Sequence, residues 1–129
     1  MTFLTNRVAR LLFAIPFGIF GIIQLMNADS VVGMVPEFIP GGIVWVYLTG
    51  LAMLAASFAI VSQRQVRLAS LLLAVMLLVF VFTVHLPAVL DGDPNAMPNL
   101  LKDTSLAGGA LLLAGIYWDW DEPLLEESL

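Results

Sequence analysis

The chain has 129 residues, of which 60% are hydrophobic and only 12% are charged, and it carries a formal net charge of -5. Its mean hydropathy is +0.99, and a chain this small cannot bury so much apolar surface in a water-soluble core. With no cysteine and one histidine, thiol chemistry, iron–sulfur clusters and a haem held by two histidines of this chain are excluded. The sequence contains no basic cluster of the kind that indicates nucleic-acid binding.

Four apolar runs are long enough to cross a bilayer, which requires about 20 mostly apolar residues. The fourth run is the weakest, because its uncharged centre is short and Lys102 must extend toward the lipid head groups. The sequence therefore predicts an all-α integral membrane protein, a four-transmembrane-helix bundle forming one domain over residues 1–129. In chain order, the expected helices cover residues 8–27, 42–62, 66–86 and 100–120, and an acidic tail follows at residues 121–129.

Small residues within the runs suggest how the helices pack. Gly18 and Gly21 lie in the first run, and Gly108 and Gly109 lie in the fourth. Because small side chains let membrane helices approach closely, this pattern favours a tight bundle, although such residues are also common in membrane helices generally. The stretch LMNADS lacks a clear A-x-A site, which favours a retained first helix over a cleaved signal peptide.

The arginines set the expected orientation. Arg7 and Arg10 precede the first run, and Arg64 and Arg67 lie between the second and third. Basic residues mark the cytoplasmic side of a membrane, so both termini are predicted to be cytoplasmic, with Lys102 as the exception. The first outer loop contains the apolar stretch VVGMVPEFIPGG, and we expect it to pack on the outer membrane surface and cap the bundle.

With this topology, most polar residues of the four runs fall in the outer half of the membrane. This asymmetry predicts an amphipathic pocket that opens to the outer face beneath the first loop. No arrangement for covalent catalysis or metal binding is visible, so the chain is not expected to be catalytic alone, although a role as an enzyme subunit stays open. The candidate ligand-binding residues are Gln24, Glu37, Thr49, Thr83, His85 and Lys102.

His85 has two interpretations. It is either a structural residue near a helix end, two positions before Pro87, or a group that exchanges protons with a ligand head group such as a quinone. The second is chemically reasonable because imidazole titrates near neutral pH. Lys102 is likewise an interfacial cation or a ligand contact, and Glu37 is a solvated loop carboxylate or a partner of His85. A Lys102–Asp103 pair is a further alternative.

Several short motifs occur in a recognisable order. They are Arg10 with Gly21, VPEFIP at residues 35–40, WVYLTG at 45–50, Arg67, VHLP at 84–87, NLLKD at 99–103, and Gly108. Together they resemble the DoxX family of small bacterial four-helix membrane proteins, in particular its DoxX-like branch, over almost the whole chain. The chain departs from that pattern at Gln24 and Met53, near which many relatives carry a basic and an acidic residue.

The resemblance implies a multi-pass protein of the bacterial cytoplasmic (inner) membrane. Members of that family are linked to thiosulfate:quinone oxidoreductase subunits and to membrane complexes that handle oxidative stress. The expected role is thus an accessory or quinone-binding subunit of a membrane oxidoreductase, with a quinone as cofactor and with lipid and such subunits as partners. A homo-oligomer stays open, as does a non-redox protein that holds a lipid or a partner helix. A small transporter is disfavoured, because it needs an intramembrane carboxylate and none is expected inside the four runs.

Overall fold

The computed structural model describes residues 3–35 and 40–118, and this part of the chain is helical with no strand. The expected all-α class is therefore confirmed for these residues. Glu37 and the centre of the first outer loop lie outside the described residues, as does the acidic tail. The elements are η1 (Phe3–Val8), α1 (Ala9–Met26), α2 (Ala28–Val31), η2 (Val32–Met34), α3 (Gly42–Val61), α4 (Val66–Phe80), η3 (Val81–His85), α5 (Leu86–Leu90) and α6 (Ala96–Ile116).

Three helical segments of the described chain are long and apolar enough to cross a membrane. They are α1, α3, and the continuous rod from Val66 to Leu90 that joins α4, η3 and α5. A third or less of each segment is buried within the protein, so large apolar side chains such as Leu12, Phe58 and Leu72 lie on the outer surface. Helices that are apolar on their outer faces need apolar surroundings, and this finding supports a membrane protein.

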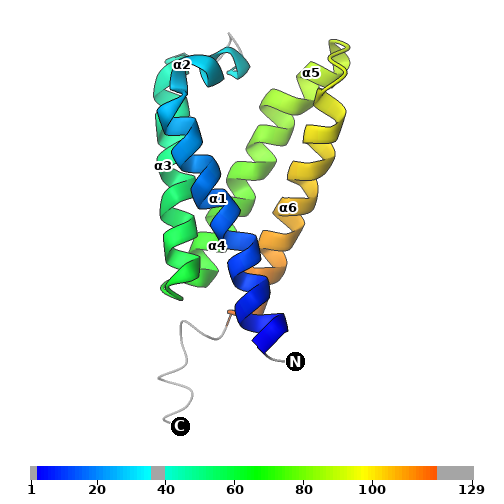
Figure 1. Ribbon diagram of the computed structural model, residues 1–129. Helices are drawn as coiled ribbons and strands as arrows, with labels where there is room; N and C mark the ends of the chain where they lie inside the picture. The colour runs from blue at the N-terminus through cyan, green and yellow to red at the C-terminus, as the bar shows by residue number, and fades with distance from the viewer. Residues whose placement is uncertain (1–2, 36–39, 119–129) are drawn as a thin grey trace.

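The long helices form two antiparallel pairs, α1 with α3 and α4 with α6, and α3 also packs against α4 (Figure 1). The start of α1, the α3–α4 turn and the end of α6 lie together at one end of the molecule, which we call the closed end. The segments α2 and α5 lie at the opposite end, which we call the open end, because the two pairs diverge toward it in Figure 1. This divergence positions the candidate site described below.

Glycine allows α1 and α3 to approach closely. A Cβ atom added at Gly18 would lie 2.6 Å from Oγ of Ser57, and one added at Gly21 would lie 2.8 Å from the carbonyl oxygen of Gly50. The expected close approach at the first-run glycines is therefore confirmed. At Gly108, in contrast, an added Cβ meets no described atom within 4 Å, so the expectation of close packing is wrong there.

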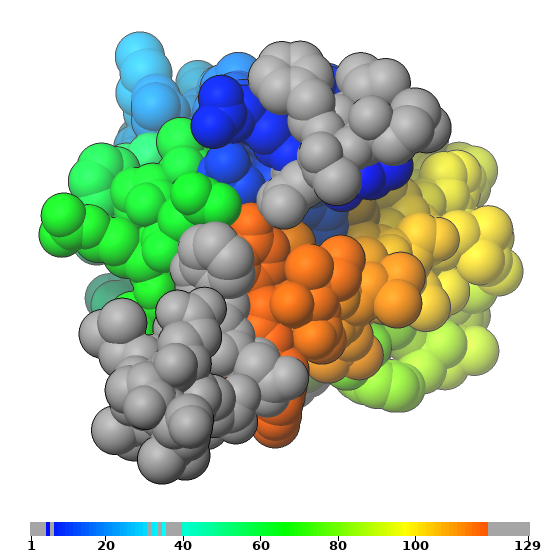
Figure 2. Space-filling view, turned by 90° about the horizontal axis from the view of Figure 1, so that it is seen from below, coloured from blue at the N-terminus to red at the C-terminus, as the bar shows by residue number. Residues whose placement is uncertain are grey.

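Arginine side chains hold the closed end together by binding the carboxyl ends of two helices. Nη1 of Arg10 donates hydrogen bonds to the carbonyl oxygens of Ile60 at 2.9 Å and Val61 at 2.8 Å. Nη1 of Arg67 donates to the carbonyl oxygen of Trp118 at 2.7 Å. The last carbonyls of a helix have no partner within it and favour a cation. Figure 2, seen from this end, shows the end of α6 in orange between green and blue segments.

Helix α6 begins and ends earlier than expected. It starts at Ala96, where the sequence predicted a start near residue 100, and it ends at Ile116. Pro98 lies in the first turn, where the backbone N–H groups need no partner within the helix, so the proline is tolerated. Asp103 is consequently about two turns inside α6 and buried. Asp103 therefore lies further inside its helix than the expected start near residue 100 implied.

The third run continues beyond its expected end at residue 86, because α5 carries it through Pro87 to Leu90. Pro87 has no N–H to donate to the carbonyl of Thr83, and its ring crowds that carbonyl. The preceding turn is the π-helical segment η3, which ends at His85. Such widened turns relieve irregularities in a helix and are frequent at functional sites. The proline thus accounts for the local geometry that presents His85.

Candidate functional site

A cleft of about 750 Å³ lies between the α1–α3 pair and the α4–α6 pair. Its volume is in the range of ligand sites, roughly 300–1,000 Å³. The wall from α1 carries three phenylalanines spaced along one face, and the apolar lining continues on α4. Apolar lining residues include Phe13, Phe17, Phe20, Leu77, Val79 and Phe80, and polar lining residues include Gln24, Thr49, Thr83, His85, Asn99, Lys102 and Asp103.

Five of the six candidate residues from the sequence line this cleft: Gln24, Thr49, Thr83, His85 and Lys102. They come from α1, α3, η3 and α6, so segments far apart in the sequence contribute to one cleft. The sixth candidate, Glu37, lies outside the described residues.

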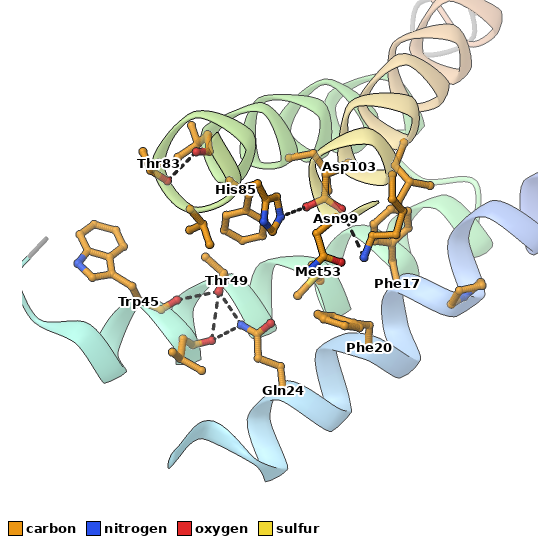
Figure 3. A pocket seen from close by; sticks show the side chains of 18 of the residues that line it. Phe17, Phe20, Gln24, Trp45, Thr49, Met53, Thr83, His85, Asn99 and Asp103 are labelled. Atoms are coloured by element: carbon orange, nitrogen blue, oxygen red, sulfur yellow. Dashed lines mark hydrogen bonds and ion pairs between the residues drawn. The ribbon is translucent and has the colours of Figure 1, made fainter. Parts of the chain in front are cut away.

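The polar centre of one wall is a buried pair between His85 and Asp103. Nε2 of His85 lies 2.7 Å from Oδ2 of Asp103, and each side chain is only 9% exposed (Figure 3). Nζ of Lys102 lies 3.7 Å from the other carboxylate oxygen, and its side chain is 56% exposed. Asp103 therefore lies between two nitrogen groups, one inside the cleft and one near solvent. A buried carboxylate requires such partners.

On the opposite wall, Gln24 joins α1 to α3. Its Nε2 donates hydrogen bonds to the carbonyl oxygen of Val46 at 2.7 Å and to Oγ1 of Thr49 at 2.6 Å. Oγ1 of Thr49 in turn donates to the carbonyl oxygen of Trp45 at 2.8 Å. Figure 3 shows this network facing His85 and Asp103. The two polar groups occupy facing walls of a cleft that is otherwise mainly apolar.

Thr83 has a local role, because its Oγ1 donates to the carbonyl oxygen of Val79 at 2.6 Å within its own helix. The indole of Trp45 donates from Nε1 to the carbonyl oxygen of Pro40 at 2.6 Å. This bond ties the start of α3 to the end of the first loop, at the edge of the cleft.

The cleft reaches the apolar outer surface of the bundle. Its lining includes Leu12 and Phe20 of α1, which are 70% and 52% exposed. It also includes Val79 of α4, which is 49% exposed. Exposed apolar side chains therefore form part of the cleft wall.

Asp103 and Asn99 also line the cleft, and neither was among the candidate residues predicted from the sequence. One signal for the His85–Asp103 contact was available, because both residues are equally far in sequence from Pro94, in the turn between α5 and α6. In an antiparallel helix pair, residues equidistant from the turn lie at the same height. Which of them face each other depends on the rotation of each helix about its axis, and that is set by packing.

The family described as a domain of unknown function, DUF8561, matches residues 13–120. The chain belongs to this family. The DUF8561 region contains every lining residue of the cleft except Leu12. No curated protein and no solved structure matches the chain.

Proposed function

We propose that this chain is a multi-pass membrane protein that binds a lipid-soluble, amphipathic molecule between its two helix pairs, with quinones as the first candidate class. The observation that carries the proposal is the cleft itself, which joins apolar walls open to the bundle surface to the buried His85–Asp103 pair. A site with apolar walls and a few convergent polar groups is typical of small-molecule binding.

In this proposal α6 is the fourth membrane span and both termini are cytoplasmic, in the bacterial inner membrane. The closed end carries Arg10 and Arg67, and basic residues favour the cytoplasmic side. The buried carboxylate of α6, Asp103, is paired with His85, which lowers the penalty for placing it in a membrane. The cleft then opens in the outer half of the bilayer.

The head group of the ligand would lie between His85 and Gln24, and its chain would lie against the phenylalanines of α1. Phe13 and Phe17 already form a tilted ring pair with centroids 5.2 Å apart, and a flat ring packs well against such side chains. The resemblance to the DoxX family supports an association with a membrane oxidoreductase, in which this chain would hold the quinone or quinol that exchanges electrons with a partner subunit.

The test is a titration of the detergent-purified protein with decylubiquinone. Trp45 lines the cleft, so its fluorescence is followed in a Trp118→Phe/Trp120→Phe background, and the NMR signals of the single histidine are followed in parallel. A saturable change in both supports the proposal, and no change in either contradicts it. Native mass spectrometry distinguishes a copurified phospholipid, which would indicate a lipid-binding protein without a redox role.

One observation favours a second candidate, which is proton-coupled transport of a small molecule. Asp103 is a buried carboxylate inside α6, and transporters use such groups to exchange protons. Vesicles containing the protein, loaded with a pH-sensitive dye, would show substrate-driven proton movement that is lost in Asp103→Asn. Absence of any proton movement with a panel of hydrophobic cations contradicts this candidate.

A further inference from the structure

Resting on the proposed function, we infer that the cleft selects aromatic head groups that donate hydrogen bonds, the hydroxyls of a hydroquinone or phenol, over head groups that only accept. The inference depends on which hydrogen-bonding atoms of the two facing polar groups are already engaged. Both groups direct their donors into the protein and leave acceptors for the ligand.

The first acceptor is Nδ1 of His85. An ionised carboxylate only accepts hydrogen bonds, so Asp103 at 2.7 Å requires the hydrogen of a neutral His85 to be on Nε2. A neutral imidazole has one N–H and one bare nitrogen, whereas a protonated ring donates from both. In the neutral state of His85, Nδ1 therefore carries a lone pair. Nδ1 makes no hydrogen bond to any described residue. Among described side chains, only Arg10 Nε and Ser70 Oγ are both fully buried and without a partner. Since Nδ1 of His85 has no partner and is not one of these two atoms, it retains accessible surface.

The second acceptor is Oε1 of Gln24. Both hydrogens of its amide nitrogen are engaged, one by the carbonyl of Val46 and one by Oγ1 of Thr49. The orientation of the amide is fixed by the network, because the carbonyl of Val46 can only accept. Oε1 has no partner among described residues, and it is not fully buried, so it also retains accessible surface. Gln24 therefore also offers an acceptor to the cleft.

Two hydroxyl groups near the site are engaged within their own helices. The hydroxyls of Thr49 and Thr83 donate to carbonyls of their own helices. Lys102 lies near the edge with its side chain 56% exposed and its Nζ directed at Asp103. Asn99 can donate or accept. A ligand carbonyl between His85 and Gln24 would face two lone pairs, whereas a hydroxyl would satisfy one of them.

Leaving buried polar atoms unpaired is unfavourable, and sites built for a hydroxyl reject analogues that lack it. The test compares decylubiquinol, kept reduced under anaerobic conditions, with its dimethyl ether, decylubiquinone and n-dodecanol, all titrated into the detergent-purified protein. We expect the dimethyl ether and the quinone to bind about 10-fold more weakly than the quinol. Dodecanol tests whether a hydroxyl without the aromatic ring suffices, and equal binding of dodecanol would contradict the aromatic part of the inference.

The outcomes separate this inference from the proposed function. If none of the probes binds, the proposed function fails and the inference fails with it. If the ether or the quinone binds as tightly as the quinol, the cleft is a ligand site but the inference is wrong.

The ¹⁵N NMR spectrum of the only histidine gives an independent check of the ligand-free protein. We expect the hydrogen on Nε2 and a bare Nδ1, and either the opposite tautomer or a doubly protonated ring would overturn the inference without any ligand. Asp103→Asn keeps the shape of the side chain but can donate as well as accept, so it no longer requires the hydrogen of His85 to be on Nε2. We therefore expect the preference for quinol over its ether to fall toward 1-fold. Asp91 is exposed, and Asp91→Asn removes the same charge away from the cleft, so this control variant should keep the full preference. Equal preferences in both variants would also overturn the inference.

Discussion

Arg10, near the start of α1, donates a hydrogen bond of 2.9 Å to the carbonyl oxygen of Ile60, which lies 50 positions later in the chain in the last turn of α3. It donates a second hydrogen bond to the carbonyl oxygen of Val61. The side chain is buried. The residue that the sequence assigned to membrane orientation therefore also has a structural role, since it satisfies the carboxyl end of a neighbouring helix.

We predict that Arg10→Met lowers the free energy of unfolding by about 1–3 kcal/mol, because a buried and a partly buried carbonyl at the end of α3 lose a donor. Thermal unfolding in detergent, followed by circular dichroism, measures this. Arg64→Met is the matched control, since Arg64 is exposed and the change in charge is the same. Equal destabilisation by both variants would show that net charge matters, not the contact with α3.

Gly21→Ala should destabilise the α1–α3 pair by about 1–3 kcal/mol, because the added methyl group meets a backbone carbonyl that cannot rotate away. The control is Gly108→Ala on α6, where no described atom lies within 4 Å of the added carbon. That change should leave stability unchanged or raise it by up to about 1 kcal/mol through helix propensity. If the two alanines have the same effect, the close approach of α1 to α3 is not required for stability.

His85→Gln should leave the fold intact, because the glutamine amide can still donate to Asp103. His85→Leu should destabilise the protein by about 3 kcal/mol, since it leaves a buried carboxylate without its inner partner. Unfolding in detergent compares the two. If the site binds a ligand as proposed, decylubiquinol affinity should fall in His85→Gln even though stability does not. Unchanged affinity would assign His85 a purely structural role.

The α3–α4 turn holds Gln65 at φ +54°, a left-handed conformation that costs a residue with a side chain roughly 1–2 kcal/mol. Gln65→Gly should therefore raise stability by about 1 kcal/mol. Gly92→Ala provides the reverse experiment, because Gly92 has φ +88° and an alanine there should be destabilising. Changes of the same sign in both turns would contradict this explanation.

The absence of cysteine makes the orientation directly measurable. Single cysteines at Ser62, near the closed end, and at Asp93, at the open end, are both exposed positions. A membrane-impermeant maleimide should label the Asp93→Cys protein in intact spheroplasts and the Ser62→Cys protein only after permeabilisation. The reverse pattern would place the cleft in the inner half of the membrane.

Much of the fold could be predicted from the apolar runs. The bounds of α1 and α3 agree with the sequence to within a residue or so, because each run ends at polar or turn-forming residues such as Asn27 and Gly41. The start of α6 was predicted too late, since the helix also includes the polar residue Asn99 before the fourth run and Pro98, which is tolerated in a first turn. Polar residues are unfavourable toward lipid and therefore tend to face one another, which is why five cleft residues could be found.

The pairing within the site could not be predicted in the same way. Whether His85 meets Asp103, Glu37 or a backbone carbonyl depends on the π-helical turn η3 and on the rotation of α6. Both are consequences of packing in three dimensions. Likewise, the contact of Arg10 with α3 carries no signal in the local sequence around either residue.

The exposure of Leu12, Phe20 and Val79 at the edge of the cleft has a consequence for how occupancy should be measured. A ligand that arrives from the hydrocarbon phase is present at its mole fraction in the membrane, not at its aqueous concentration. Diluting the protein with more lipid, at constant total ligand and volume, should therefore empty the site. Affinities for this protein are best expressed per lipid molecule, and comparisons between detergents hold only when the amount of micellar phase is matched.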